Sequence, residues 1–179
     1  MGCVQLKFKL SLLVLLASIS LVACNSNDSV SEEINTQDLK ELVHEYSIGD
    51  IKNETASITS EELIITNSDE SETVYSLPED EFFVSIAPYI NETHPCTNHS
   101  LTGCQGEMVE EEFDVYIEDM EGNVMLEDTL KTQANGFIDL WLPQDKTYNI
   151  IINHNGKKVE SEFSTFEQDG TCITTMQLT

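Results

Sequence analysis

The alternation of apolar and polar residues predicts β-strands throughout the second half of the chain. Apolar and polar positions alternate in "EFDVYIED" at 112–119, as they do when one face of a strand is buried. In "IDLWLP" at 138–143, Ile138, Leu140 and Leu142 are expected on one face of a strand and Asp139 and Trp141 on the other. The tripeptide "HNG" at 154–156 separates two such stretches and is typical of a tight hairpin turn, beside which His154 is expected to be exposed. "TCITTMQLT" at 171–179 is expected as a last strand, with Cys172, Thr174, Met176 and Leu178 on one inward face. In total about six strands with regular turns are expected, which favours a small β-sandwich.

The first half of the chain begins with a different periodicity. Residues 36–46 have helical spacing, with Thr36 as the expected N-cap and Gly49 as the residue that ends the helix. The apolar stripe consists of Leu39, Leu42, Val43 and Tyr46. His44 lies outside this stripe, so it is expected to be exposed to solvent.

Short strands are expected after the helix. Residues 50–60 are polar and are expected to form a loop, whereas 62–66, 73–78 and 80–89 have strand patterns. The last of these ends at Pro88, where the chain enters a segment rich in Asn, Thr, Pro and Gly.

These patterns predict an α+β fold that is mainly β, with a small N-terminal α+β part followed by a C-terminal antiparallel β-sandwich. The expected divisions are a lipoprotein signal peptide at 1–23, a flexible tether at 24–35, an N-terminal α+β domain at 36–92, a Cys/His metal loop at 93–108 and a C-terminal β-sandwich domain at 109–179.

The N-terminus indicates export from the cytoplasm. A short basic region containing Lys7 and Lys9 precedes thirteen uncharged residues at 10–22, which suit the apolar core of a secretion signal. The following "LVAC" resembles the lipobox of bacterial lipoproteins, in which the cysteine, here Cys24, is lipidated and becomes the first residue of the mature protein. The predicted location is the cell envelope, with the lipid as the only membrane attachment.

Charge narrows the choice of partners. The whole chain has 8 basic and 33 acidic residues, and removing Lys7 and Lys9 with the signal leaves a formal charge of −27. Such a surface repels nucleic acids and anionic lipid headgroups, so neither is expected as a partner. The sequence also lacks a G-x-S-x-G elbow and a Gly-rich phosphate loop, so a hydrolase or a nucleotide-dependent enzyme is not expected.

The cysteine count points to a site that uses thiols. After Cys3 leaves with the signal and Cys24 takes the lipid, three cysteines remain: Cys96, Cys104 and Cys172. An odd number outside the cytoplasm cannot pair completely within one monomer. At least one thiol is therefore free, bound to a ligand, or paired with a second chain in a homodimer.

The segment "THPCTNHSLTGC" at 93–104 contains two cysteines and two histidines, which are potential metal ligands. Seven residues separate Cys96 from Cys104, more than the two to four usual between paired ligands of structural zinc fingers. His94 and His99 flank Cys96 and are candidates for a fourth or transient metal ligand. The sequence alone leaves a Cys96–Cys104 disulfide, a metal site and a reactive thiol pair as alternatives.

Three longer segments carry a resemblance to a known family. "FFVSIAPYINETHPCTNHSLTGCQGE" at 82–107, "NGFIDLWLP" at 135–143 and "TCITTMQL" at 171–178 resemble the CueP family of exported bacterial copper-binding proteins. In that family three cysteines bind copper, which implies that Cys96, Cys104 and Cys172 are the copper ligands here. The lipobox departs from the better-known soluble members and leaves the copper acceptor open.

The expected function is therefore copper tolerance or copper delivery outside the cytoplasm, with Cu(I) held by three thiolates and an exported copper enzyme as a candidate acceptor. Soft sulfur ligands select Cu(I), in agreement with this expectation. Two alternatives remain: a thiol-redox protein that reduces Cu(II), and a structural surface lipoprotein with a Cys96–Cys104 disulfide.

Overall fold

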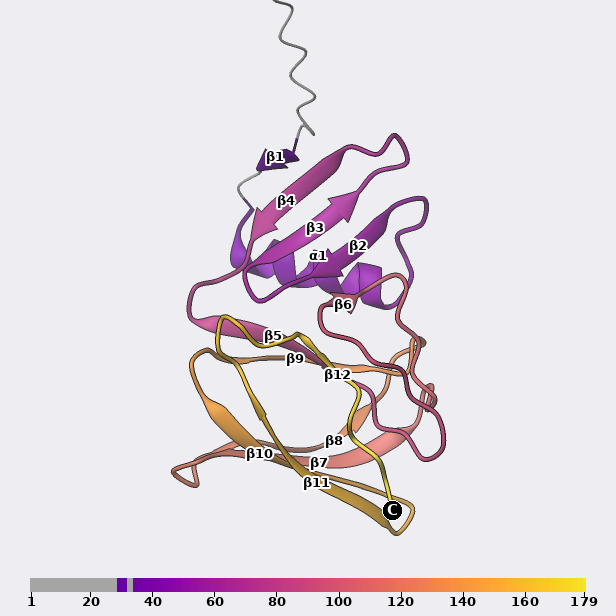
Figure 1. Cartoon of the computed structure of the whole chain (residues 1–179), viewed down its shortest axis with the longest axis vertical. Helices are drawn as coiled ribbons and strands as arrows, with labels where there is room; N and C mark the ends of the chain where they lie inside the picture. Colours follow the sequence, from indigo (N-terminus) through magenta and orange to yellow (C-terminus); the bar gives the residue numbers. More distant parts are fainter. Residues whose placement is uncertain (1–28, 32–33) are drawn as a thin grey trace, which may run out of the picture.

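The computed structural model describes residues 29–31 and 34–179 and arranges them in three layers (Figure 1). The upper layer is a five-stranded sheet with one helix. The middle layer is a three-stranded sheet, and the lower layer is a four-stranded sheet. The expected fold class, mainly β with a short N-terminal helix and a C-terminal sandwich, is confirmed.

The upper sheet has the strand order β1-β4-β3-β2-β6. Its strands are β1 (Ser29–Ser31), β2 (Thr55–Ile58), β3 (Glu62–Thr66), β4 (Glu72–Ser76) and β6 (His99–Ser100). Neighbouring strands are antiparallel except for β1 and β4, which are parallel. The presence of β6 matters most, because it joins part of the predicted Cys/His loop to this sheet.

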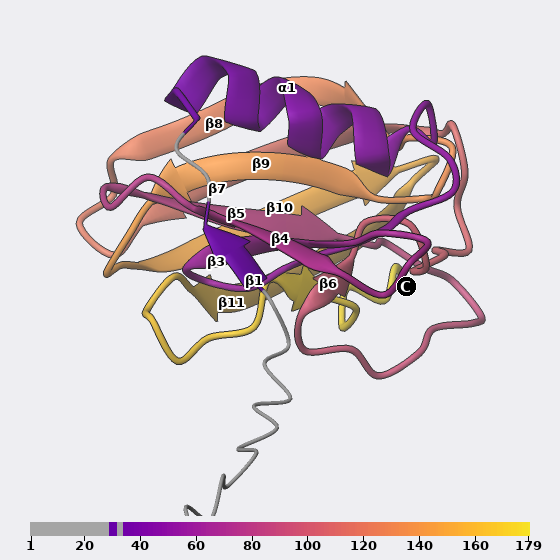
Figure 2. The same cartoon turned by 90° about the horizontal axis from the view of Figure 1, so that it is seen from above.

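Helix α1 (Thr36–Ser47) runs beside the strands of the upper sheet (Figure 2). Its N-cap is Asn35 rather than the expected Thr36, because the Asn35 side chain accepts a hydrogen bond from the backbone N–H of Asp38. Gly49 follows the helix with φ of +77°, a conformation that glycine adopts at low cost and that ends helices, as predicted. His44 is exposed, also as predicted.

The lower sheet and the middle sheet form the C-terminal sandwich. The lower sheet has the order β11-β10-β7-β8 and is antiparallel throughout. Its strands are β7 (Glu112–Asp119), β8 (Val124–Lys131), β10 (Thr147–His154) and β11 (Lys157–Ser164). The middle sheet, in the order β12-β5-β9, consists of β5 (Glu81–Ile86), β9 (Ile138–Pro143) and β12 (Cys172–Ile173).

The middle sheet is buried on both faces, and side-chain alternation divides its residues between two cores. Phe82 and Val84 face the lower sheet and join the main sandwich core, whereas Phe83 faces α1 and the upper sheet. Because both faces of the middle sheet are covered, nearly all residues of β5 are buried and its sequence does not alternate between apolar and polar positions. β9 follows the predicted division, with Ile138 and Leu142 in the sandwich core and Trp141 on the opposite side.

Two sequence-based expectations about strands are wrong. Residues 50–60 are not all loop, because β2 pairs with β3 and buries Ala56 and Ile58. The expected last strand is shorter than its pattern suggested: regular strand structure ends at Ile173. Burial nevertheless keeps alternating beyond it, with Thr174, Met176 and Leu178 buried and Thr175 and Gln177 exposed.

Cys172 and Met176 both lie on the buried side of this segment but belong to different cores. Cys172 packs against Ala87 and Phe137, whereas Met176 lies fully buried in the sandwich core. Both residues are buried, as expected, but in different places.

Some expectations about the N-terminus lie outside the described residues. These are the signal peptide at 1–23, the lipidation of Cys24 and most of the tether. Among the described residues, no helix has the length and apolar character needed to span a bilayer. The domain boundaries stay a prediction; β5, which was assigned to the N-terminal part, pairs with β9 of the C-terminal part.

Candidate metal centre

Cys104 is held by a tight turn that belongs to the upper layer. The backbone N–H groups of Gly103 and Cys104 both donate to the carbonyl of Ser100, at 3.2 and 2.9 Å. A Cβ at Gly103 would lie 2.7 Å from the Ser100 hydroxyl, so a larger residue there would require that hydroxyl to move. The turn is fixed to β2 by a hydrogen bond of 3.2 Å from the Ala56 N–H to the Thr102 hydroxyl, which anchors Cys104 from above.

Cys172 comes from the middle layer. β12 pairs in parallel with β5, and Cys172 stands in register with Ser85. The side chain is 6% exposed and packs with Ala87 and Phe137. Its position is therefore set by the packed centre of the molecule rather than by a loop.

Cys96 is tied to Cys172 through the main chain. The Thr97 carbonyl accepts a hydrogen bond of 3.0 Å from the Cys172 N–H. Gly170 packs closely on the same residue, and a Cβ at Gly170 would lie 2.5 Å from the Thr97 oxygen. The Cys96 thiol also donates to the Asn98 carbonyl at 3.3 Å, so its direction is fixed as well.

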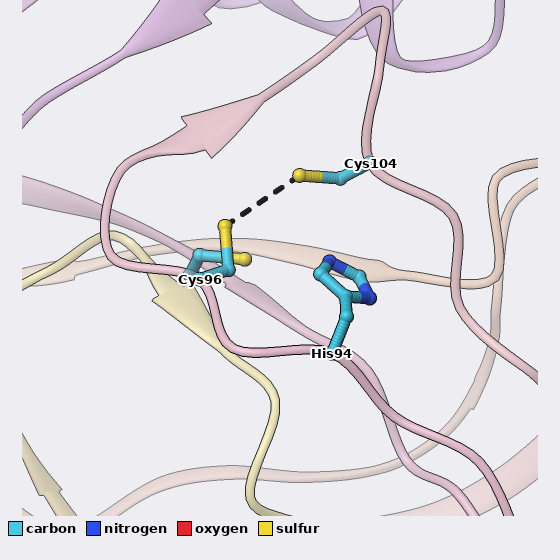
Figure 3. Close-up of side chains that lie close together, drawn as sticks. His94, Cys96 and Cys104 are labelled. Carbon is cyan, nitrogen blue, oxygen red and sulfur yellow. Dashed lines mark hydrogen bonds between the residues drawn. The ribbon is translucent and has the colours of Figure 1, made fainter.

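The three cysteines and His94 converge on one point. One ligand atom from each of these four residues lies within 4.8 Å of all the others. The sulfur atoms of Cys96 and Cys104 are 3.6 Å apart, far beyond the length of a disulfide bond, and all three cysteines are free thiols (Figure 3). Within the described part of the chain, no other group of His, Cys, Asp or Glu side chains is arranged in this way.

His94 has a nitrogen atom available to a ligand. Its Nε2 atom is buried and has no hydrogen-bond partner among the described residues. The ring contacts the edge of Phe137, with centroids 6.3 Å apart, and lies beside the sulfur atoms in Figure 3. Leaving a buried ring nitrogen unpaired costs free energy, and a bound metal ion would remove that cost.

His99 is near the cluster but is not part of it. Its side chain is fully buried, and its ring packs at a tilt of 56° against Phe137 with centroids 4.5 Å apart. The Nε2 atom lies 3.3 Å from the Ser85 hydroxyl. Ser85 in turn donates to Asp139. Burial, and secondarily the charge of His94, lowers the pKa of His99 to about 4, so this ring is neutral at physiological pH.

Burial also shifts the pKa values of two of the thiols, in each case toward the uncharged form. Desolvation, followed by the neighbouring Cys96 thiol, raises the pKa of Cys172 well above its ordinary value. Desolvation also raises the pKa of Cys104, with Cys96 again adding to the shift. Both groups are therefore protonated at neutral pH before a metal binds, and a metal ion that takes thiolate ligands must displace their protons.

Glu107 ties the two ends of the loop together. Its carboxylate accepts hydrogen bonds from the backbone N–H groups of Ile90 at 2.5 Å and Asn91 at 2.9 Å, and from the Asn91 side chain. Desolvation alone would raise its pKa, but the hydrogen bonds from Asn91, Ile90 and Glu92 outweigh it and lower the pKa to about 2. Glu107 is therefore a structural partner of the backbone at 90–91.

The structure also shows what sequence reasoning missed. His154 is not exposed as expected, because its ring packs on Phe113 and its side chain is only 9% exposed. Thr97 and Gly170 were overlooked, although both position the cysteines. A glycine two residues before Cys172 was the available indication, since glycine beside a strand often marks a close backbone approach.

Comparisons with known proteins agree with this geometry. Residues 38–177 match the profile of a family described as periplasmic copper-binding protein CueP. The crystal structure of S.CueP is similar to this fold, with a TM-score of 0.74 and 35% sequence identity over 79% of this chain and 88% of that chain. No curated protein sequence matches the chain.

Proposed function

Because this chain belongs to the CueP family of periplasmic copper-binding proteins, we propose that it binds copper as Cu(I) through the thiolates of Cys96, Cys104 and Cys172. The observation that carries this proposal is the convergence of three free sulfur atoms and one imidazole nitrogen within 4.8 Å. Sulfur is the ligand type that favours Cu(I) over harder divalent cations.

The difference in solvent exposure among the three thiols supports a stepwise mechanism of copper capture. Cys96 and Cys104 are partly exposed, whereas Cys172 is buried beneath them. An incoming ion meets the two loop thiols first and then reaches Cys172, and each thiol that becomes a ligand releases its proton. Release to an acceptor follows the reverse order, by exchange of one sulfur ligand at a time.

His94 is the proposed fourth ligand, either in the loaded state or during entry of Cu(II). His99, the other histidine of the loop, is proposed to support the site from outside, since its ring is held by Ser85 and Phe137. Imidazole suits Cu(II) better than thiols of neutral charge do, so His94 could receive the oxidised ion before reduction.

A free-thiol count tests the copper proposal. We would alkylate the purified mature protein with and without Cu(I) and count modified cysteines by mass spectrometry. The expected result is three reactive thiols without copper and protection of all three with it. A Cys96–Cys104 disulfide that resists alkylation until reduced, with Cys172 unaffected by copper, would favour the structural alternative.

The distance between the sulfur atoms of Cys96 and Cys104 favours a second function, the reduction of Cu(II). The 3.6 Å between the sulfur atoms of Cys96 and Cys104 allows a disulfide to form after small side-chain movements. Two thiols would then supply two electrons to two Cu(II) ions, giving two Cu(I), one disulfide and two protons. Mixing the reduced protein with Cu(II) in the absence of oxygen tests this second function. It requires that two Cu(I) ions form and two thiols are lost per protein molecule.

The cellular role proposed is copper tolerance or delivery to an exported copper enzyme from a lipid-anchored position. The anchor rests on Cys24 in "LVAC", which follows a short apolar segment. Labelling cells with a fatty-acid probe tests this part alone. Wild-type protein that stays unlabelled, while the same cells label other lipoproteins, would remove the anchor and leave the copper proposal intact.

A further inference from the structure

Strand β2 provides two backbone groups that hold segments carrying cysteines. Ala56 and Ile58 lie two residues apart on β2, and both are buried. The Ala56 N–H donates to the Thr102 hydroxyl at 3.2 Å, and the Ile58 carbonyl accepts a hydrogen bond of 2.7 Å from the Thr171 hydroxyl. Each of these threonines lies one or two positions before a cysteine, so both hydrogen bonds act close to the metal centre.

The segment between Cys96 and Cys104 pairs with the same strand. Within it, His99 and Ser100 form β6, which is antiparallel to β2 and places His99 in register with Ile58 (Figure 1). β6 has only two residues, so the ladder of β2 and β6 offers few hydrogen bonds to hold the segment. All three cysteines are therefore positioned relative to β2.

The Thr171 hydroxyl reinforces this short pairing. It accepts a hydrogen bond of 2.9 Å from the His99 backbone N–H and donates one of 2.7 Å to the Ile58 carbonyl. It thus joins two residues that stand opposite each other in the ladder. Thr171 is fully buried, and its own carbonyl accepts a hydrogen bond of 2.8 Å from the Ser85 N–H on β5. One residue therefore links the upper sheet to the middle sheet directly beside Cys172.

Loss of this hydroxyl would remove two hydrogen bonds from a buried region. Buried backbone groups that lose a partner cost free energy, so β6 would shift relative to β2. Such a shift moves Cys96 and Cys104 relative to Cys172. A metal ion that needs all three sulfur atoms at bonding distance responds to this movement, and substitution of groups that orient metal ligands typically lowers affinity by about 10- to 100-fold.

Resting on the proposed binding of Cu(I), we propose that the hydroxyls of Thr171 and Thr102 are positioning groups of the metal centre. They hold the segments that carry the cysteines at a fixed spacing on β2. Each hydroxyl acts through the main chain rather than as a metal ligand. Thr171 fixes Cys172 beside the loop, and Thr102 fixes the turn that bears Cys104.

The first test removes the buried hydroxyl. Thr171→Val has nearly the same shape as the wild type and should lower Cu(I) affinity by about tenfold or more. Thr171→Ser keeps the hydroxyl and should bind Cu(I) almost as tightly as the wild type. The measurement is competition with a Cu(I) chelator under reducing conditions, at a temperature at which circular dichroism shows that each variant is folded.

Thr165→Val is the matched control. Thr165 is also fully buried, and its hydroxyl donates to the Pro143 carbonyl at 2.9 Å and accepts a hydrogen bond of 3.2 Å from the Lys146 N–H. These bonds join the end of β9 to the start of β10 and involve no segment that carries a cysteine. Thr165→Val should lower the melting temperature by a few degrees, as Thr171→Val does, and keep the Cu(I) affinity of the wild type.

A second pair of variants keeps the test decisive if Thr171→Val does not fold. Thr102 is half-buried, so Thr102→Val disturbs the core less. It releases the turn of Cys104 from β2 and should lower Cu(I) affinity by about tenfold. Thr59→Val is its control, because Thr59 is also half-buried and its hydroxyl accepts hydrogen bonds from two backbone N–H groups in the turn after β2. Thr59→Val should keep the affinity of the wild type.

The outcomes distinguish a positioning role from general support of the fold. The expected result is weaker Cu(I) binding in Thr171→Val and Thr102→Val and unchanged binding in Thr165→Val and Thr59→Val. Equal affinity in all four variants, or the same loss of affinity in each variant and its control, would overturn the positioning role and leave copper binding intact. A wild-type protein that does not take up Cu(I) at all would overturn the proposed function and, with it, this inference.

Discussion

The backbone N–H of Cys172 donates a hydrogen bond of 3.0 Å to the carbonyl of Thr97. Through this bond the last strand is fixed beside the residue that directly follows Cys96. Two of the three sulfur atoms are thus held near each other by the main chain, with no covalent link among the three thiols. The site can then bind and release a metal ion without first reducing a disulfide.

Substituting the buried thiol should affect copper most clearly. Cys172→Ser replaces a soft ligand with a poor one and should weaken Cu(I) binding by at least about 10- to 100-fold. The measurement is a competition titration against a Cu(I) chelator under reducing conditions. Thr174→Ser, a small change at a buried position two residues further on, is the control and should bind like the wild type. Undiminished affinity in Cys172→Ser would defeat the three-thiolate site.

The two loop histidines should behave differently. His94→Ala removes a ring nitrogen that lies within the cluster and should lower Cu(I) affinity by less than about tenfold, because imidazole matches Cu(I) less well than thiolate does. His99→Ala empties a buried position against Phe137 and should lower the free energy of unfolding by about 2 kcal/mol or more. Chelator competition and thermal unfolding on both variants separate the effects; a larger loss of affinity in His99→Ala would contradict the assignment.

Gly170 should be needed for the close approach of Thr97. In Gly170→Ala the new Cβ would fall 2.5 Å from the Thr97 oxygen, so the loop must move. Both the free energy of unfolding, by about 1–3 kcal/mol, and the Cu(I) affinity should fall. Gly122→Ala is the comparison: its φ of +84° makes the substitution strained, but no atom lies within 4 Å of the new Cβ. That variant should lose stability and keep its affinity, and an equal loss of affinity in both would refute the local explanation.

Glu107 should stabilise the loop in a pH-dependent way. Its folded-state pKa of about 2 lies below the ordinary value of 4.5, so its stabilising contribution is complete above about pH 4.5 and is lost as pH falls toward 2. Glu107→Gln should therefore melt a few degrees below the wild type at pH 7, and the difference should shrink between pH 4.5 and 2. Glu79→Gln, at an exposed turn position, is the matched control. A difference in melting temperature that is constant with pH would exclude the carboxylate as its cause.

Copper binding should become tighter as pH rises. Burial raises the pKa values of Cys172 and Cys104, so these thiols bind protons at neutral pH and must release them to become ligands. The logarithm of the Cu(I) affinity, corrected for protonation of the chelator, should increase with pH between 6 and 8. The slope should be smaller for Cys172→Ser by about one proton per copper ion. A pH-independent affinity would mean that the thiols are already ionised or do not bind.

Local sequence patterns determined most of the secondary structure. The helical stripe of α1 and the alternation in β7 and β9 follow from which side chains must be buried, and this requirement leaves a periodic trace in the sequence. β2 escaped notice because only Ala56 and Ile58 are buried in a short polar stretch. Propensity cannot identify a strand whose main support is its neighbour β3.

The metal site, too, was predicted from the sequence only in part. The number of cysteines, the export signal and the resemblance to a copper-binding family indicate Cys96, Cys104 and Cys172 from the sequence alone. Their convergence depends on the parallel pairing of β12 with β5 and on the turn that ties Cys104 to β2. These contacts join residues far apart in the chain, so no local pattern encodes them.

The surroundings of Cys172 show the physical limit most directly. Period-two alternation correctly predicted that Cys172 is buried, but it could not predict which core receives the side chain. Cys172 packs against Phe137, whereas Met176, on the same buried side of the segment, packs in the sandwich core. The sequence determines which residues leave water, because hydrophobicity belongs to each side chain. Tertiary structure decides which of them meet, because packing is a property of the whole assembled chain.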